Sequence, residues 1–137
     1  MEKKGSEISE LRNLFRKAKN GGKMTGTYLT ELHKIFGKRF LKAWECVKER
    51  RVKAYYFKPS AKTIWVVVGK KKEYLVMPKA DFCSCDDFYY RVIDGEIHLC
   101  YHLIAQKISE SLGLYDKIKE GDYFYDILIR EFRKVTL

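Results

Sequence analysis

Three cysteines and one histidine form the group of residues with the clearest chemistry in this chain. They stand as Cys83-x-Cys85, then fourteen intervening residues, then Cys100-x-His102. Three thiolates and one imidazole nitrogen are a complete ligand set for one tetrahedral Zn²⁺ ion, and they leave no coordination position open for water. The spacing therefore predicts a structural zinc site with these four residues as ligands and Zn²⁺ as the cofactor.

The backbone around these ligands must direct all four side chains to one point. Residues two apart in an extended segment point to the same side, so Cys83 and Cys85 can face one ion, whereas in a helix they would diverge. We therefore expect Cys100 at or before the start of the helix that contains His102, where the peptide N–H dipoles also favour a thiolate. The second nitrogen of the histidine is expected to donate to a backbone or carboxylate oxygen. Acids close enough in sequence to accept that hydrogen bond are Asp86 and Asp87.

Other assignments of these residues stay open from the sequence. His98 lies two residues before Cys100 and would point the same way in an extended segment, although the helix expected after His102 favours the latter. A reduced thiol cluster without a metal is the plain alternative. The fourth cysteine, Cys46, lies beside Trp44 on an apolar helix face and is expected to be a small core residue.

The first third of the chain has the periodicity of helices. Residues 7–19 predict a basic amphipathic helix that stops at the Asn-Gly-Gly of 20–22. A second helix is expected from Thr25 or Thr27 to Phe36, with a break at Gly37, and a third from 38 to 51. Two helices joined by a tight glycine turn are also the pattern of a helix-turn-helix.

From residue 52 the apolar period changes to two, which predicts strands at 53–57, 63–68 and 73–77 in an antiparallel meander that Pro78 ends. A helix is expected from His102 to 112 with Gly113 as its C-cap, and a last helix from Asp122. The prediction is thus one α+β domain, 1–137, with N-terminal helices, a three-stranded antiparallel meander, a zinc module and C-terminal helices. Its parts are a basic helical region 1–51, a sheet 52–79, a zinc module 80–112 and a C-terminal helical extension 113–137.

The charge of the chain is divided unevenly. Residues 1–79 hold 21 Lys/Arg against 7 Asp/Glu, whereas residues 80–137 hold 7 against 11. A surplus of this size attracts phosphate and predicts nucleic acid, DNA foremost, as a partner of the front half. The plain alternative is that lysine only keeps the protein soluble. The cations expected to contact the nucleic-acid backbone are Arg12, Arg16, Lys19, Lys38, Arg39, Lys42, Arg50, Arg51 and Lys53.

Aromatic residues alternate with lysines in the first two strands. Tyr55, Phe57 and Trp65 stand among Lys53, Lys58 and Lys62. Such a pattern suits a platform on which unpaired bases stack beside a phosphate track. Most aromatic strand residues are core, however, and the sequence does not decide between the two interpretations.

The ligand order Cys83-x-Cys85 and Cys100-x-His102 resembles that of the SWIM-type zinc finger. Its local context, Cys85-Asp86-Asp87-Phe88 and the run from Cys100 to Ala105, is similar to that family over residues 74 to 110. The resemblance implies a non-catalytic zinc module used in DNA binding and protein–protein contacts. The alanine three residues after the histidine, Ala105, is also a point of resemblance to the SWIM subunit of the Shu complex. This narrower resemblance implies a role in DNA repair and homologous recombination beside a RadA/Rad51-type recombinase or a paralogue.

Several classes of function find no support in the residues. The His-x-Glu and Pro-Cys-x-x-Cys elements of zinc deaminases and a phosphate-binding glycine loop are absent, so we expect no enzyme and no small-molecule substrate. No apolar run spans a bilayer and no signal peptide is evident, so we expect no membrane partner and an intracellular place, in the cytoplasm or at the nucleoid. The scarcity of Asn and Gln beside abundant Lys and Glu is typical of thermophilic proteins.

Three functions therefore follow as expectations. The first is a zinc-binding protein that contacts nucleic acid through its basic half. The second is an adaptor that docks on another protein through the zinc module and the last helix. The third is a transcription regulator that uses the helix-turn-helix.

Overall fold

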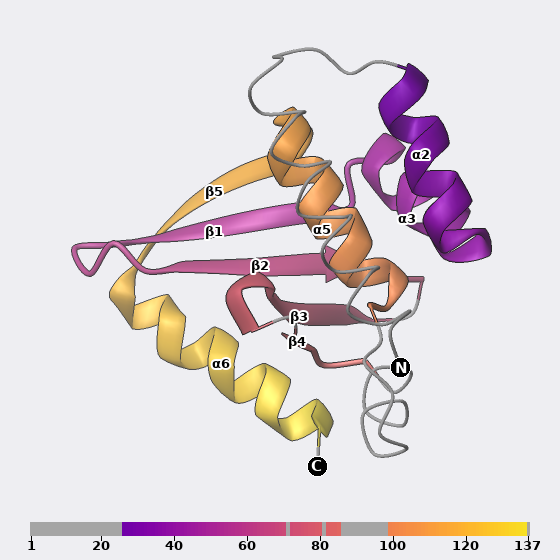
Figure 1. The fold of residues 1–137 in the computed structure, drawn as a ribbon. Coiled ribbons are helices and arrows are strands. Elements are labelled where there is room, and N and C mark those ends of the chain that lie inside the picture. The colour runs from indigo at the N-terminus through magenta and orange to yellow at the C-terminus, as the bar shows by residue number, and fades with distance from the viewer. Residues whose placement is uncertain (1–25, 71, 81, 86–98, 137) are drawn as a thin grey trace.

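The computed structural model describes residues 26–70, 72–80, 82–85 and 99–136 (Figure 1). Within these ranges four α-helices surround a mixed five-stranded sheet, which confirms the α+β class. The helix expected at 7–19 lies outside the described residues. The division of the chain into four parts stays a prediction.

The two helices expected before the sheet are present as α2 (Gly26–Phe36) and α3 (Lys38–Lys48). Gly37 joins them with a φ of +58°, a left-handed conformation that glycine adopts without strain, so the predicted break is confirmed. α3 ends at Lys48 and not at Arg51, because the N–H of Arg51 donates to the carbonyl of Cys46 and turns the chain into the first strand. A helix-turn-helix role for this pair stays a prediction.

The predicted meander is confirmed as three antiparallel strands: β1 (Val52–Lys58), β2 (Thr63–Val68) and β3 (Glu73–Met77). After the short 3₁₀ helix η1 (Pro78–Ala80), β4 (Phe82–Cys83) pairs antiparallel with β3. A further strand, β5 (Asp116–Gly121), runs parallel to β1 at the opposite edge, which gives the order β4-β3-β2-β1-β5.

The expectation of a purely helical C-terminal region is therefore wrong for residues 116–121. β5 is an edge strand with the sequence Asp-Lys-Ile-Lys-Glu-Gly, in which only Ile118 is apolar. Its regular structure comes from pairing with β1, a segment far away in the sequence, and charged residues are common on edge strands because they discourage pairing with other chains. Apolar periodicity does not reveal such a strand.

Helices cover both faces of the sheet. α5 (Tyr101–Leu112) lies across one face, with α2 and α3 beside it, and buries residues such as Val52, Ala54 and Val67 (Figure 1). α6 (Asp122–Thr136) covers the other face, where Leu128 and Phe132 pack on side chains of β1 and β2. Apolar residues of the strands thus point to both faces of the sheet and contribute to two cores.

The proposed stacking platform for bases is wrong. Phe57 is 0% exposed and Trp65 is 8% exposed, and the two side chains belong to the cores on opposite faces of the sheet. Tyr55 is partly buried and stacks on Phe57 with ring centroids 6.4 Å apart. These aromatic residues stabilise the fold and offer no shared surface for bases.

Candidate metal centre

The end of the sheet and the start of α5 position the four candidate ligands. Cys83 is the last residue of β4, and Cys85 follows two residues later. The intervening Ser84 fixes this segment to β3, because its N–H donates to the carbonyl of Leu75 (3.0 Å) while its Oγ accepts from the N–H of Leu75 (3.0 Å). Extended backbone with alternate side chains on one side is what the Cys-x-Cys spacing predicts.

The other two ligands stand at the beginning of α5. Cys100 is the N-cap residue, with extended backbone at φ −67° and ψ 164°, and His102 lies in the first helical turn. The expected position of Cys100 at the helix start is confirmed. Arg39 holds the preceding residue, since its Nη1 donates to the carbonyl of Leu99 at 2.9 Å.

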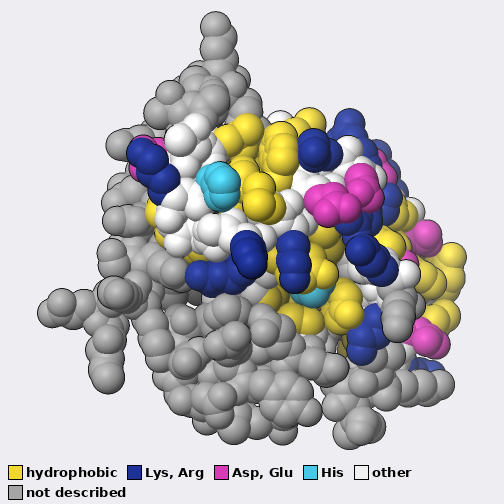
Figure 2. Space-filling view, turned by 90° about the vertical axis from the view of Figure 1, so that its right-hand side faces the viewer, with side chains coloured by type: hydrophobic (Ala, Val, Ile, Leu, Met, Phe, Trp, Pro, Cys, Tyr) yellow, Lys and Arg dark blue, Asp and Glu magenta, His cyan; other side chains and the backbone are white. Residues whose placement is uncertain are grey.

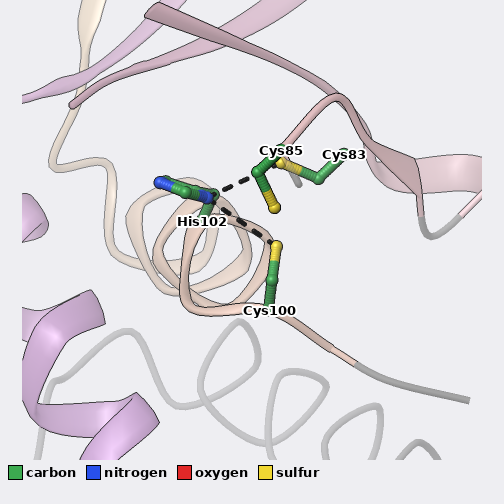
Figure 3. A group of neighbouring side chains, drawn as sticks. All are labelled: Cys83, Cys85, Cys100 and His102. Carbon is green, nitrogen blue, oxygen red and sulfur yellow. Dashed lines mark hydrogen bonds between the residues drawn. The ribbon is translucent and has the colours of Figure 1, made fainter. Parts of the chain in front are cut away.

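The structure brings the four side chains together in a buried cluster (Figure 3). Their ligand atoms all lie within 4.8 Å of one another, and none of the four residues is more than 4% exposed. The Nδ1 of His102 lies 3.7 Å from the Sγ of Cys83 and 3.9 Å from the Sγ of Cys100. Tetrahedral Zn²⁺ with its usual bond lengths places ligand atoms about 3.5 to 3.8 Å apart. The donor set and its spacing therefore fit a zinc ion.

The electrostatics of the metal-free cluster favour neutral thiols. Contacts with the Cys100 and Cys85 thiols, together with burial, raise the pKa of the Cys83 thiol far above its usual range. Burial also raises the pKa of the Cys100 thiol to about 12. A bound Zn²⁺ reverses this preference because it stabilises thiolates directly, so metal binding must displace protons.

His102 is held between two tyrosine rings. The ring centroid of Tyr74 lies 4.2 Å from that of the imidazole, and the centroid of Tyr101 lies 4.0 Å away. The Nε2 atom is buried and has no hydrogen-bond partner in the described ranges, so the expected bond from this nitrogen to an oxygen is not found there. Asp86 and Asp87, the acids proposed for that role, lie outside the described residues, as does the rival ligand His98.

Sequence reasoning missed both tyrosines as parts of the site. Their only signal was position, since Tyr101 adjoins His102 and Tyr74 stands two residues before the apolar Val76 in its strand. The fourth cysteine, Cys46, is 1% exposed in the core and stays outside the ligand cluster, as expected. Burial raises the pKa of its thiol.

The cations predicted to contact nucleic acid fall into three groups. Arg12, Arg16 and Lys19 lie outside the described residues. Lys38, Lys42 and Arg50 are exposed on and just after α3. The remaining three have protein partners: Arg39 at Leu99, Arg51 at Glu45 and Glu49, and Lys53 at Asp116. The ammonium of Lys53 also lowers the pKa of the Asp116 carboxyl through their hydrogen bond.

None of the helices in the described ranges combines the length and apolar character needed to cross a membrane.

Fold and site together define a small α+β protein with a buried Cys₃His cluster, able to hold a metal ion, between a sheet edge and a helix start. No protein-family model matches the chain. An uncharacterized protein of Archaeoglobus fulgidus is 38% identical over 96 residues, which cover 70% of this chain and 75% of the relative. The zinc finger SWIM domain-containing protein 7 homolog of Dictyostelium discoideum is 27% identical over 110 residues, 79% of this chain and 70% of the relative.

A third relative, zinc finger SWIM domain-containing protein 7 of Mus musculus, is 26% identical over 110 residues, 78% of this chain and 72% of the relative. These similarities and the Cys/His cluster agree with the ligand order in the sequence. Together they support a SWIM-type zinc finger in this chain.

Proposed function

We propose that this protein is a non-catalytic zinc-binding module that binds nucleic acid, DNA foremost, through its basic surface and acts in DNA repair or homologous recombination. The observation that carries the nucleic-acid proposal is a surplus of cations in the front half of the chain. Residues 26–70 and 72–79 contain 13 Lys/Arg against 4 Asp/Glu. Lys and Arg side chains are spread over the side of the molecule that carries α2 and α3 (Figure 2).

The exposed cations on this side suit contact with phosphates better than recognition of bases. They stand on the helices and in the turn between β2 and β3, and include residues that sequence reasoning did not select. These exposed Lys and Arg residues are Lys34, Lys38, Lys42, Lys48, Arg50, Lys70 and Lys72. Lysine contacts with phosphate position a protein on the duplex but carry little sequence information.

Salt dependence of binding tests this proposal. The logarithm of the association constant should fall linearly with the logarithm of salt concentration, by about 0.9 per neutralised phosphate on duplex DNA and about 0.7 on single strands. Lys38 is exposed, so Lys38→Ala should remove one phosphate contact and lower the slope by the contribution of that contact. Affinity that does not change with salt would refute nucleic-acid binding by the basic surface.

A role in recombination is supported by the resemblance of the residues around His102 to the SWIM subunit of the Shu complex. The expected partner is then a RadA/Rad51-type recombinase or a paralogue. Titration of the purified zinc-loaded protein into such a recombinase, by calorimetry, tests the partner directly. The absence of heat at micromolar concentrations, with both proteins folded, would argue against it.

Docking on a protein without nucleic acid is the second candidate, and one observation favours it. An open groove of about 560 Å³ lies between α6 and the strands β2 and β3, lined by apolar side chains such as Ile64, Leu75 and Ile129. On the same helix, Tyr123 is 73% exposed and Ile127 is 46% exposed. Capture of partners that survive nuclease treatment and are lost in Ile129→Glu would favour this function over the first.

A further inference from the structure

A row of three aromatic rings with a lysine at each end passes through the candidate metal centre. The Nζ of Lys42 lies 5.7 Å from the centroid of the Tyr101 ring, and the Tyr101 ring contacts the His102 ring at a tilt of 37°. The His102 ring also contacts the Tyr74 ring at a tilt of 32°, and the centroid of the Tyr74 ring lies 5.4 Å from the Nζ of Lys72. We call these five residues, Lys42, Tyr101, His102, Tyr74 and Lys72, the cation–ring ladder.

The cation–ring ladder connects elements that are distant in sequence. Lys42 belongs to α3, Tyr101 and His102 to α5, Tyr74 to β3, and Lys72 to the turn before β3. Its ends are exposed, its tyrosines are partly buried and its central histidine is 3% exposed. A buried metal ligand is thus linked by ring contacts to two lysines at the surface.

The turn that carries Lys72 is built closely around the Tyr74 ring. The N–H of Gly69 donates to the carbonyl of Lys72 at 2.8 Å and closes the turn. A Cβ at Gly69 would lie 2.7 Å from Cε2 of Tyr74, so only glycine fits beside the ring. The position of Lys72 therefore depends on the position of Tyr74.

The orientation of the central ring suits a bound metal ion. His102 directs Nδ1 toward the thiols, and its buried Nε2 has no hydrogen-bond partner in the described ranges. Metal-bound histidines are usually oriented by a hydrogen bond from the second nitrogen. Among the described residues, the groups that contact the imidazole ring are the rings of Tyr74 and Tyr101, so these two rings limit its orientation.

We propose that Lys42 and Lys72 are phosphate contacts of the nucleic-acid surface and that metal occupancy places them through the cation–ring ladder. This inference rests on the proposed function and locates part of its surface at the metal centre. A lysine held over an aromatic ring is oriented without being neutralised, so its charge stays available for phosphate. Neither lysine has a carboxylate within ion-pair distance in the part of the chain that the structure describes.

The first test measures salt slopes for a fluorescein-labelled DNA duplex with the full-length zinc-loaded protein. Lys42→Ala and Lys72→Ala should each lower the slope by about 0.9, because each removes one phosphate contact. Lys117→Ala is the matched control: its Nζ lies 5.7 Å from the Tyr115 ring, but the pair stands at β5, the opposite edge of the sheet from β4. Its slope should equal that of the unmodified protein.

The second test separates the ladder from zinc binding itself. Tyr74→Leu removes the ring contact with His102, whereas Tyr74→Phe keeps it, and elemental analysis of each variant records the zinc content. In zinc-loaded protein the Leu variant should lose the Lys72 contribution to the salt slope, and the Phe variant should retain it. A Leu variant that keeps zinc and the full slope would overturn the coupling to the metal.

The outcomes distinguish this inference from the proposed function. If Lys38→Ala lowers the salt slope while Lys42→Ala and Lys72→Ala do not, nucleic-acid binding stands and the ladder surface is refuted. If the unmodified protein binds the duplex without salt dependence, the proposed function fails, and the inference fails with it.

Discussion

Loss of one ligand should remove the dependence of thermal stability on zinc, and Cys100→Ser is the sharpest such change. Cys100 occupies the N-cap position of α5 without a side-chain capping bond and is a member of the Cys/His cluster, and serine nearly keeps the size of the side chain and is favoured at that position. The substitution therefore removes the ligand with little other change. Structural zinc provides about 10 to 16 kcal/mol in peptides that are unfolded without it.

A smaller value is expected here, because core packing and hydrogen bonds also hold the segments that carry the ligands. α5 packs Leu103, Ile104 and Ile108 in the core, each 0% exposed, and Ser84 ties the Cys-x-Cys segment to β3. The metal then stabilises the folded state by mass action, by about 4 kcal/mol when free zinc is a thousandfold above its dissociation constant. For a domain of this size that corresponds to a rise in Tm of about 12 to 20 °C.

Calorimetric scans with and without added zinc measure this rise. The unmodified protein should show it and Cys100→Ser should not, while the metal-free forms of the two should melt within a few degrees of each other. Cys46→Ala is the matched control, since Cys46 is a buried cysteine outside the cluster, and its melting should keep the zinc response. An undiminished zinc response in Cys100→Ser would refute the assignment of Cys100 as a ligand.

Three further predictions concern pH, the turn beside the site and the core. The apparent zinc affinity should fall as pH decreases, because zinc must displace protons from the cysteine thiols, and the pKa values of Cys83 and Cys100 are both raised, the latter to about 12. Each displaced proton contributes about tenfold per pH unit, so these two thiols give a fall of at least about a hundredfold, to which a proton released from Cys85 would add. Competition with a chromophoric chelator measures this, and an affinity independent of pH would contradict it. Gly69→Ala should lower the free energy of unfolding by about 1 to 3 kcal/mol in urea titrations, because the added Cβ would clash with the Tyr74 ring. An unchanged urea midpoint would show that the ring moves away freely. Phe57→Ala should lower the free energy of unfolding by about 3 to 5 kcal/mol in the same assay, because the side chain is fully buried. A mild effect on stability together with a large loss of nucleic-acid affinity would instead favour the stacking platform for bases.

The sequence predicted the elements whose signals are local. Gly37 marked the break between α2 and α3, Gly113 marked the end of α5 with a φ of +69°, and alternating residues marked the three strands of the meander. The metal cluster was also predictable, because its ligand types and spacing are rare in combination. In each case a few neighbouring residues contain the whole physical reason for the structure.

Features that depend on distant partners were not predicted. β5 exists because β1 offers it hydrogen-bonding partners, and β4 is too short for any periodicity to show. The sequence also did not show which cations have protein partners: Arg39 contacts the backbone before Cys100, whereas Lys38 and Lys42 on the same helix are exposed. Likewise, only the folded arrangement places Tyr74 against His102.

The most direct test of the metal centre is X-ray absorption at the zinc edge, together with elemental analysis, on the purified full-length protein. One zinc ion per chain is expected, with three sulfur ligands at about 2.3 Å and one nitrogen ligand at about 2.0 to 2.1 Å. Protein that is folded and contains no zinc under zinc-replete conditions, or a zinc ion with fewer than three sulfur ligands, would contradict a closed centre formed by Cys83, Cys85, Cys100 and His102.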